Sequence, residues 1–260
     1  MCAQAANALI LHSRGTRMPT VFISHSHADK PIVRFLWHDL LQCGVSVWID
    51  EGETQPGDSL TQQIGAALDD VDAVAGMLSP DAIRSRWVCK EINAAIARSV
   101  DTGRPVVIPV LLPGFSPTAV PALLADTFQV RLAEPRDYDT QVCSLASAVS
   151  TSSSGDKLDP CRLPMTANRR ERIVEIADRS PMREWAVQYL KHKLSTEDPT
   201  ERYWVYIALA QIGGAEPTSI VEAGLDDPNE FARRGAEDAV RLFGDEDPPG
   251  PCSTNEGEDQ

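Results

Sequence analysis

Short apolar runs alternate with segments of helical period along the first half of the chain, and this alternation constrains the fold more than any other feature. Thr20–Ile23 is a β-branched and aromatic run without polar alternation, typical of a strand that is buried on both faces. Similar runs follow at Val45–Ile49, Ala73–Leu78 and Val106–Leu112, and Phe128–Leu132 is a short fifth run. Strands that alternate with helices in this way predict an α/β fold with a mostly parallel, doubly wound sheet.

Helix signals occupy the segments between these runs. Pro31 suits the first turn of a helix, and Gly44 stands where a glycine commonly ends one. Ser59–Gln62 fits a capping box, and Arg86–Ser99 has helical period. Ligands of such sheets bind at the carboxyl ends of the strands, so we expect a site among the loops that follow the strands.

The composition changes near residue 150. Residues 147–156 are rich in Ser, Thr and Gly, and Pro160 and Pro164 follow, which indicates a linker at 151–165. Beyond it strand signals disappear, and five segments have helical period: Asn168–Asp178, Met182–Leu194, Pro199–Ile212, Pro217–Leu225 and Asn229–Phe243. We therefore expect a first domain at 18–150 and a small all-helical domain at 166–244.

Two stretches of the helical part echo each other. Asp198-Pro199 and Asp227-Pro228 each open a stretch that ends in glycine, at Gly213 and Gly244, with offsets of 29 and 31 residues. A period of this length is typical of stacked helix pairs, and the stretch resembles short HEAT-type repeats. Only two copies are recognisable, so we expect this part to lean on the first domain or on another chain.

The charge balance and the apolar runs restrict the partners. The chain has 260 residues and a formal net charge of −14, whereas nucleic-acid binders gather Lys and Arg to neutralise phosphates. Asp245–Gln260 carries six carboxylates and no basic residue, which predicts a disordered acidic tail. The segment before Met18 lacks the basic start of a signal peptide, and no apolar run reaches the ~20 residues of a membrane helix. These features predict a soluble, cytoplasmic protein without nucleic-acid or membrane partners.

Several kinds of site are disfavoured by missing motifs. The six cysteines stand singly without a C-x-x-C pair, so we expect reduced thiols, and neither a zinc site nor a disulfide framework. No P-loop motif is present and no G-x-G-x-x-G follows the first strand, which argues against these phosphate sites. A phosphoacceptor receiver would need an Asp at the end of the third strand, where Ser79-Pro80 stands.

The stretch Ser85–Ile92 carries the strongest chemical signal. Trp87 and Glu91 are four residues apart, so on a helix they lie one above the other at the edge of the apolar stripe. A carboxylate there is partly desolvated, which favours a raised pKa and a role as acid, base or charge stabiliser. Taken alone, such a glutamate is more often an ordinary surface residue.

A functional role for Glu91 is favoured once the neighbouring segments are considered, because residues 18–150 resemble a TIR domain, of the Toll/interleukin receptor family, in its bacterial form. The matching pieces occur in the family's order and at about its spacing: Val21–Asp29, Gly44–Asp50, Gln55–Leu60, Met77–Ser79, Ser85–Ile92 and Pro105–Pro113.

The resemblance implies a flavodoxin-like five-stranded sheet and, as in many members, an NAD⁺ glycohydrolase or cyclase. The essential glutamate of those members corresponds to Glu91. The residues that would contact substrate are Ser24, His25, Ser26, Asp50 and Trp87. NAD⁺ is then the substrate, no metal or further cofactor is expected, and bacterial antiphage defence is the expected setting. Whether the product is linear ADP-ribose or a cyclic isomer stays open.

A second reading of the same family is a non-catalytic scaffold. In adaptor members the loop that matches Asp50–Asp58 mediates TIR–TIR assembly, and the helical repeats would supply another docking surface. Individual residues also keep alternatives: Asp29 is expected to be a helix cap or turn former rather than a catalyst, and Asp50 either contacts substrate or structures its loop. Trp48 is expected in the core, and the histidines of the first turn either bind ligand or lie exposed.

Overall fold

The computed structural model describes residues 18–49, 70–84, 95–99, 101–153, 163–178 and 182–244. The chain divides into two compact units, residues 1–163 and 164–260. The predicted acidic tail, most of the predicted linker and the predicted helix that starts at Ser59 lie outside the described residues. Within them, no helix is both long and apolar enough to cross a membrane.

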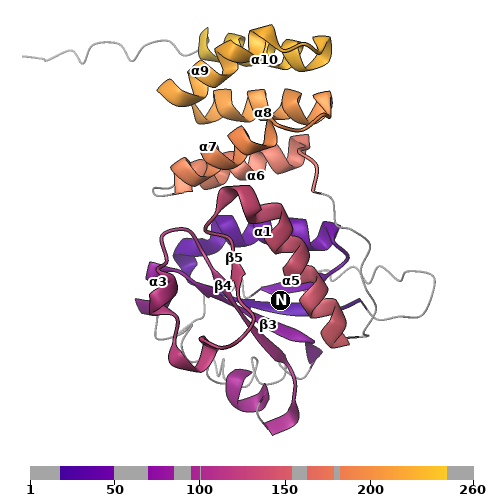
Figure 1. The fold of residues 1–260 in the computed structure, drawn as a ribbon, viewed down its shortest axis with the longest axis vertical. Helices are drawn as coiled ribbons and strands as arrows, with labels where there is room; N and C mark the ends of the chain where they lie inside the picture. Colours follow the sequence, from indigo (N-terminus) through magenta and orange to yellow (C-terminus); the bar gives the residue numbers. More distant parts are fainter. Residues whose placement is uncertain are drawn as a thin grey trace, which may run out of the picture. The chain divides into compact units, whose positions relative to one another are not determined.

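The first unit contains a five-stranded sheet in the order β2-β1-β3-β4-β5 (Figure 1). Its strands are β1 (Thr20–Ser24), β2 (Ser46–Ile49), β3 (Ala73–Leu78), β4 (Val106–Leu111) and β5 (Val130–Arg131). Every neighbouring pair is parallel. The predicted α/β fold with a parallel sheet is therefore confirmed, and β5 is shorter than the five residues predicted for it.

The central strands are buried on both faces, as their unbroken apolar runs predict. Successive side chains of a strand point to opposite faces, and in β1 Val21, Phe22 and Ile23 are all buried. Phe22 packs against Val74 of β3 and against Ala95, which lies in the helical residues 95–99. Two helices that contact each other, α1 (Lys30–Gln42) and α5 (Tyr138–Ser153), also contact the sheet.

The signals at the ends of α1 act as predicted. Pro31 lies in the first turn, where its missing N–H costs nothing. Gly44 follows the helix with a φ of 77°, a left-handed conformation that glycine adopts without strain. The N–H of Val45 then donates to the carbonyl of Leu40 at 3.0 Å, which turns the chain towards β2.

Three expectations differ from the structure. The linker is predicted to begin at residue 151, but α5 continues to Ser153, and its Ser/Thr-rich end packs into the unit through the buried residues Val149 and Ser150. Trp48 is 37 % exposed, since it covers Phe22 (ring centroids 5.1 Å apart) from the rim of the core. Cys43 is disulfide-bonded, so the expectation of reduced thiols is wrong there, whereas Cys143 is free.

The second unit is helical throughout its described residues. Its helices are α6 (Ala167–Ala177), α7 (Met182–Lys193), α8 (Pro199–Ile212), α9 (Ala215–Ala223) and α10 (Glu230–Gly244), with the short turn η5 (Gly224–Asp226) between the last two. They stack in sequence order, and α8 contacts the other four helices (Figure 1). All five predicted helices are present.

Small residues let α10 approach α8 closely. Ala232, Gly235, Ala236 and Ala239 form the buried stripe of α10. A Cβ added at Gly235 would lie 2.7 Å from the Cα of Tyr203, so a larger residue would push the two helices apart. Close backbone approach therefore replaces large side chains at this helix pair.

A buried ion pair fixes the turn that leads into α10. Arg202 of α8 donates from Nε and Nη2 to the two carboxylate oxygens of Asp227, at 2.9 and 3.0 Å. The Tyr206 hydroxyl donates to Asp227 at 3.1 Å, and the N–H of Asn229 donates to it at 2.9 Å. Such a bidentate pair fixes distance and orientation together. Asp198, at the equivalent place before α8, caps its own helix by accepting from the N–H of Thr200.

The ion pair and its neighbour Tyr206 all have shifted pKa values. The hydrogen bond to Asp227 is the main cause that raises the pKa of Arg202. Burial alone would raise the pKa of Asp227, but the hydrogen bonds from Arg202, Asn229 and Tyr206 outweigh it and hold that pKa below its ordinary value. Burial, together with the neighbouring Asp227 charge, raises the pKa of the Tyr206 hydroxyl to about 12.

Replacing Asp227 by Ala should destabilise the second unit by about 3–5 kcal/mol, because it leaves the Arg202 guanidinium buried without its counter-charge. Hydrogen–deuterium exchange of peptides from α8 and α10 in the full chain, measured over a urea series, reports this free energy. The exposed neighbour Asp226 provides the control, since Asp226→Ala removes the same group outside the ion pair. A loss of equal size in both variants would contradict the role given to the pair.

The stability of the second unit should also change at both ends of the pH scale. The folded-state pKa of Asp227 is lowered, so its contribution is present above the unfolded pKa of about 3.9 and is lost as the pH falls through the folded value. The pKa of Tyr206 is raised to about 12, so its contribution is present below the unfolded pKa of about 10 and is lost as the pH rises towards the folded value. The same exchange experiment from pH 3 to 11 checks this: Tyr206→Phe should reduce the alkaline loss, to which Tyr203 with its raised pKa also contributes, and should leave the acid loss in place.

Candidate functional site

The strand order reverses direction between β1 and β3, which makes the carboxyl ends of these two strands the expected binding edge of the sheet. The chain runs from β1 outwards to β2 and then returns to the other side of β1 as β3. Loops that follow two such strands leave the sheet in opposite directions, and ligands of parallel α/β sheets bind at this switch point. The candidate site is therefore built from the turns after Ser24 and after Leu78.

Three buried serines line these turns. Ser24 ends β1, Ser26 lies in the turn after it, and Ser79 directly follows β3. Their exposed fractions are 1 %, 7 % and 3 %, so each hydroxyl needs a partner within the protein. Ser24 and Ser26 are among the predicted site residues, whereas Ser79 is not.

One carboxylate oxygen joins two of these serines. The hydroxyl of Ser26 donates to Oδ2 of Asp29 at 2.7 Å, and the hydroxyl of Ser79 donates to the same oxygen at 2.7 Å. The N–H of Asp29 donates to the carbonyl of Ser26 at 3.0 Å and closes the 3-10 turn η1 (His27–Asp29). Asp29 is a turn former and occupies the N-cap position of α1, yet its side chain makes no capping hydrogen bond.

Ser79 also starts the next helix, α3 (Pro80–Arg84). Its hydroxyl oxygen accepts from the N–H of Ala82 at 2.9 Å, and its carbonyl accepts from the N–H of Ile83 at 3.1 Å. The described residues stop at Arg84 and resume at Ala95, which is buried. The predicted residues Trp87 and Glu91 lie outside the described residues, as does Asp50.

The two histidines of the first turn differ in exposure. His25 is half-buried, with Nδ1 3.5 Å from the carbonyl oxygen of Ile23, whereas His27 is exposed. His25 is therefore held beside the end of β1. Among the described residues, no group of three His, Cys, Asp or Glu side chains is arranged to hold a metal ion.

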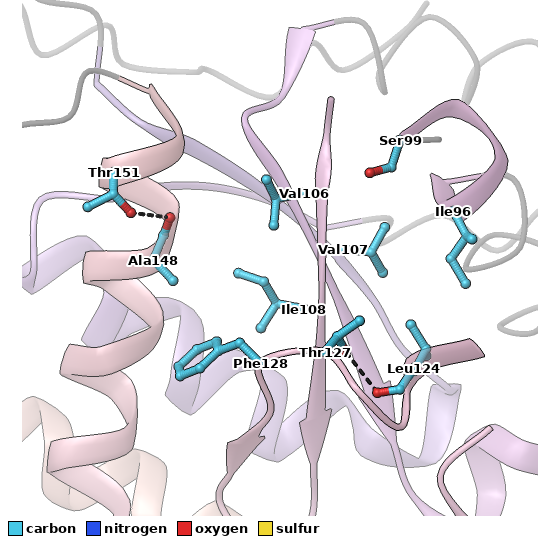
Figure 2. A pocket seen from close by; sticks show the side chains of 10 residues that line it. All are labelled: Ile96, Ser99, Val106, Val107, Ile108, Leu124, Thr127, Phe128, Ala148 and Thr151. Atoms are coloured by element: carbon cyan, nitrogen blue, oxygen red, sulfur yellow. Dashed lines mark hydrogen bonds between the residues drawn. The ribbon is translucent and has the colours of Figure 1, made fainter. Parts of the chain in front are cut away.

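A separate apolar hollow of about 500 Å³ lies at the other end of the sheet (Figure 2). Val106 and Ile108 come from the first half of β4, Phe128 precedes β5, and Ala148 lies on α5. The remaining lining residues are Ile96, Ser99, Val107, Leu124, Thr127 and Thr151. The hollow is at the amino half of β4, so it is distinct from the predicted site at the carboxyl ends of the strands.

The sequence of residues 21–146 matches the family described as TIR domain. These residues therefore form a TIR domain, and they include the turns that carry the buried serines and all of the sheet except Thr20. The match confirms the resemblance for this part of the chain.

Three curated relatives share part of this sequence. A 2' cyclic ADP-D-ribose synthase, BtTIR of Bacteroides thetaiotaomicron, is 35 % identical over 96 residues, which are 36 % of this chain and 33 % of that protein. The synthase AbTIR of Acinetobacter baumannii is 37 % identical over 91 residues (35 % and 34 %). The NAD(+) hydrolase TcpC of Escherichia coli is 32 % identical over 90 residues (34 % and 29 %). The chain thus spans about a third of the length of these relatives.

Among solved structures, the TIR domains of the activated Roq1 resistosome, which recognises the pathogen effector XopQ, are 17 % identical to this chain. The comparison covers 66 % of this chain and 98 % of that one, with a TM-score of 0.34. At that score the likeness adds nothing to the assignment of the fold.

Proposed function

We propose that this protein cleaves NAD⁺ at the bond between nicotinamide and ribose, as a TIR-type glycohydrolase or cyclase. The observation that carries the proposal is the similarity of the TIR domain, at 32–37 % identity, to proteins named as cyclic ADP-ribose synthases and as an NAD(+) hydrolase. The buried serines at the β1/β3 switch point support it, because a nucleotide would bind at that edge of the sheet.

Cleavage of this bond requires few catalytic groups. Nicotinamide leaves a cationic pyridinium as a neutral molecule, so no proton has to be delivered to the leaving group. The difficulty is the oxocarbenium-like centre that develops on the ribose. One carboxylate can stabilise that charge or hold the ribose hydroxyls, in partial analogy to glycosidases.

We assign this carboxylate to Glu91 and propose that Trp87 walls the ribose and nicotinamide. Ser24, His25 and Ser26 would contact the nucleotide from the β1 side, and Asp50 would contact it from the end of β2. The same ribosyl centre yields ADP-ribose when water attacks it, and a cyclic isomer when a hydroxyl of the ADP-ribose attacks it.

Replacing Glu91 by Gln or Ala should lower kcat for NAD⁺ cleavage by at least about 10²-fold, because the developing positive charge loses its only assigned counter-charge. Product analysis by mass spectrometry, with the protein at assembling concentrations, measures the loss. The control is Glu222→Ala, which removes an exposed carboxylate from α9. Wild type and Glu91→Ala that both leave NAD⁺ intact would overturn the proposal.

A second candidate function, self-association, is favoured by the apolar hollow beside β4. Phe128 is 55 % exposed and Val106 is 37 % exposed at its rim (Figure 2). Clustered apolar surface of this kind is typical of association sites. We propose that a second copy of the TIR domain buries it, with residues 50–58 as the other contact. Assembly and catalysis are compatible, and the repeats of the second unit would then serve sensing or oligomerisation in antiphage defence.

Phe128→Asp should raise the concentration at which the protein self-associates at least tenfold, because it places a charge in the apolar contact. Light scattering over a concentration series measures this. Leu41→Asp is the matched control, since Leu41 is a similarly exposed apolar residue (43 %) of α1 outside the hollow. Equal assembly of wild type and Phe128→Asp would exclude this surface.

A further inference from the structure

We infer that Asp29 is a positioning residue for the proposed reaction: its carboxylate holds the turn after β1 and the turn after β3 at one fixed separation. The inference rests on the proposed function, because the separation of the two turns affects catalysis only if the substrate reacts between them. The residues that carry it are Ser26, Asp29 and Ser79.

The carboxylate bridges parts of the chain that are distant in sequence. Oδ2 of Asp29 accepts from Ser26, three residues away, and from Ser79, fifty residues away, at 2.7 Å in each case. Hydrogen bonds of a hydroxyl to a carboxylate are short and about twice as strong as neutral ones. Ser26 and Ser79 are buried, so loss of the half-buried Asp29 carboxylate would leave two buried hydroxyls without their acceptor.

The direction of the Ser79 hydroxyl is fully determined. Its oxygen accepts from the N–H of Ala82 at 2.9 Å, so its single hydrogen is free to donate, and it donates to Asp29. Asp29 is thereby connected through Ser79 to the first turn of α3. Contacts between α3 and η1 accompany this connection.

The two serines that Asp29 joins lie next to different groups of proposed site residues. On the β1 side, the turn contains Ser24, His25 and Ser26, the proposed substrate contacts. On the β3 side, α3 leads in sequence to Trp87 and Glu91. A misplacement of about 1 Å between a bound substrate and a catalytic group can cost on the order of 10²-fold in rate. A bridge of two short hydrogen bonds that fixes the two turns is therefore expected to affect the rate without touching the substrate.

Substitutions at Asp29 separate this geometric role from a chemical one. Asp29→Ala removes the acceptor and should lower kcat/KM for NAD⁺ by about 10–100-fold. Asp29→Asn keeps a carbonyl oxygen with two lone pairs, which can accept from both serines, and should retain activity within about threefold of wild type. Ser79→Ala keeps the Ser26 contact and should lower kcat more than it raises KM. The control is Asp101→Ala, an exposed carboxylate at the opposite end of the sheet.

The exchange rate of the Ala82 amide gives a reading that is independent of activity. Asp29→Ala and Ser79→Ala should both accelerate its exchange in the full chain, whereas Asp29→Asn and Asp101→Ala should not. An unchanged Ala82 amide in Asp29→Ala would overturn the bridge. A loss of activity in Asp29→Asn as deep as that in Asp29→Ala would overturn the positioning role and point to direct chemistry of the carboxylate. If wild type leaves NAD⁺ intact, the proposed function fails and this role fails with it, while the Ala82 exchange still reports whether the bridge exists.

Discussion

Burial of β1 and β3 on both faces is the constraint on which the rest of the first unit depends. Because helices or helical residues cover both faces, every side chain within these strands goes to apolar packing. Polar groups are then restricted to the strand ends, where the backbone turns away from the sheet. The position of Ser24, Ser26 and Ser79 at the carboxyl edge is thus a consequence of the packing.

The same constraint explains why the polar cluster contains a carboxylate. Hydroxyls that are pressed against an apolar core lose their water and need protein partners. One aspartate oxygen satisfies two of them, and it does so between turns that the sheet already brings together. The second unit uses a comparable solution, in which Asp227 gathers Arg202, Tyr206 and the N–H of Asn229. In both clusters, the hydrogen bonds that satisfy the buried polar groups also fix the relative positions of the segments that carry them.

Local signals predict most of the fold. The strands up to β4 and the five helices of the second unit follow from runs and periods that span a few residues each. Tertiary context decides what those signals miss, as in α5, whose Ser/Thr-rich end carries the buried residues Val149 and Ser150. At the site, Ser24 and Ser26 can be found from their place after a strand. The link from Asp29 to Ser79 cannot, since no periodicity relates residues fifty positions apart, and Glu91 stays a prediction.

The shortness of β5 has a consequence for how copies of the chain can associate. β5 pairs only with Val110 and Leu111, so the first half of β4 keeps an edge without a described strand partner. Leu111 accepts from Leu132 on the β5 side, and alternation along the strand turns residue 109 to that side as well. Residue 109 is a proline and has no N–H to offer, which interrupts the ladder that an incoming strand would need. The edge is thereby protected from strand addition, and any complex formed there must be specified by its side chains.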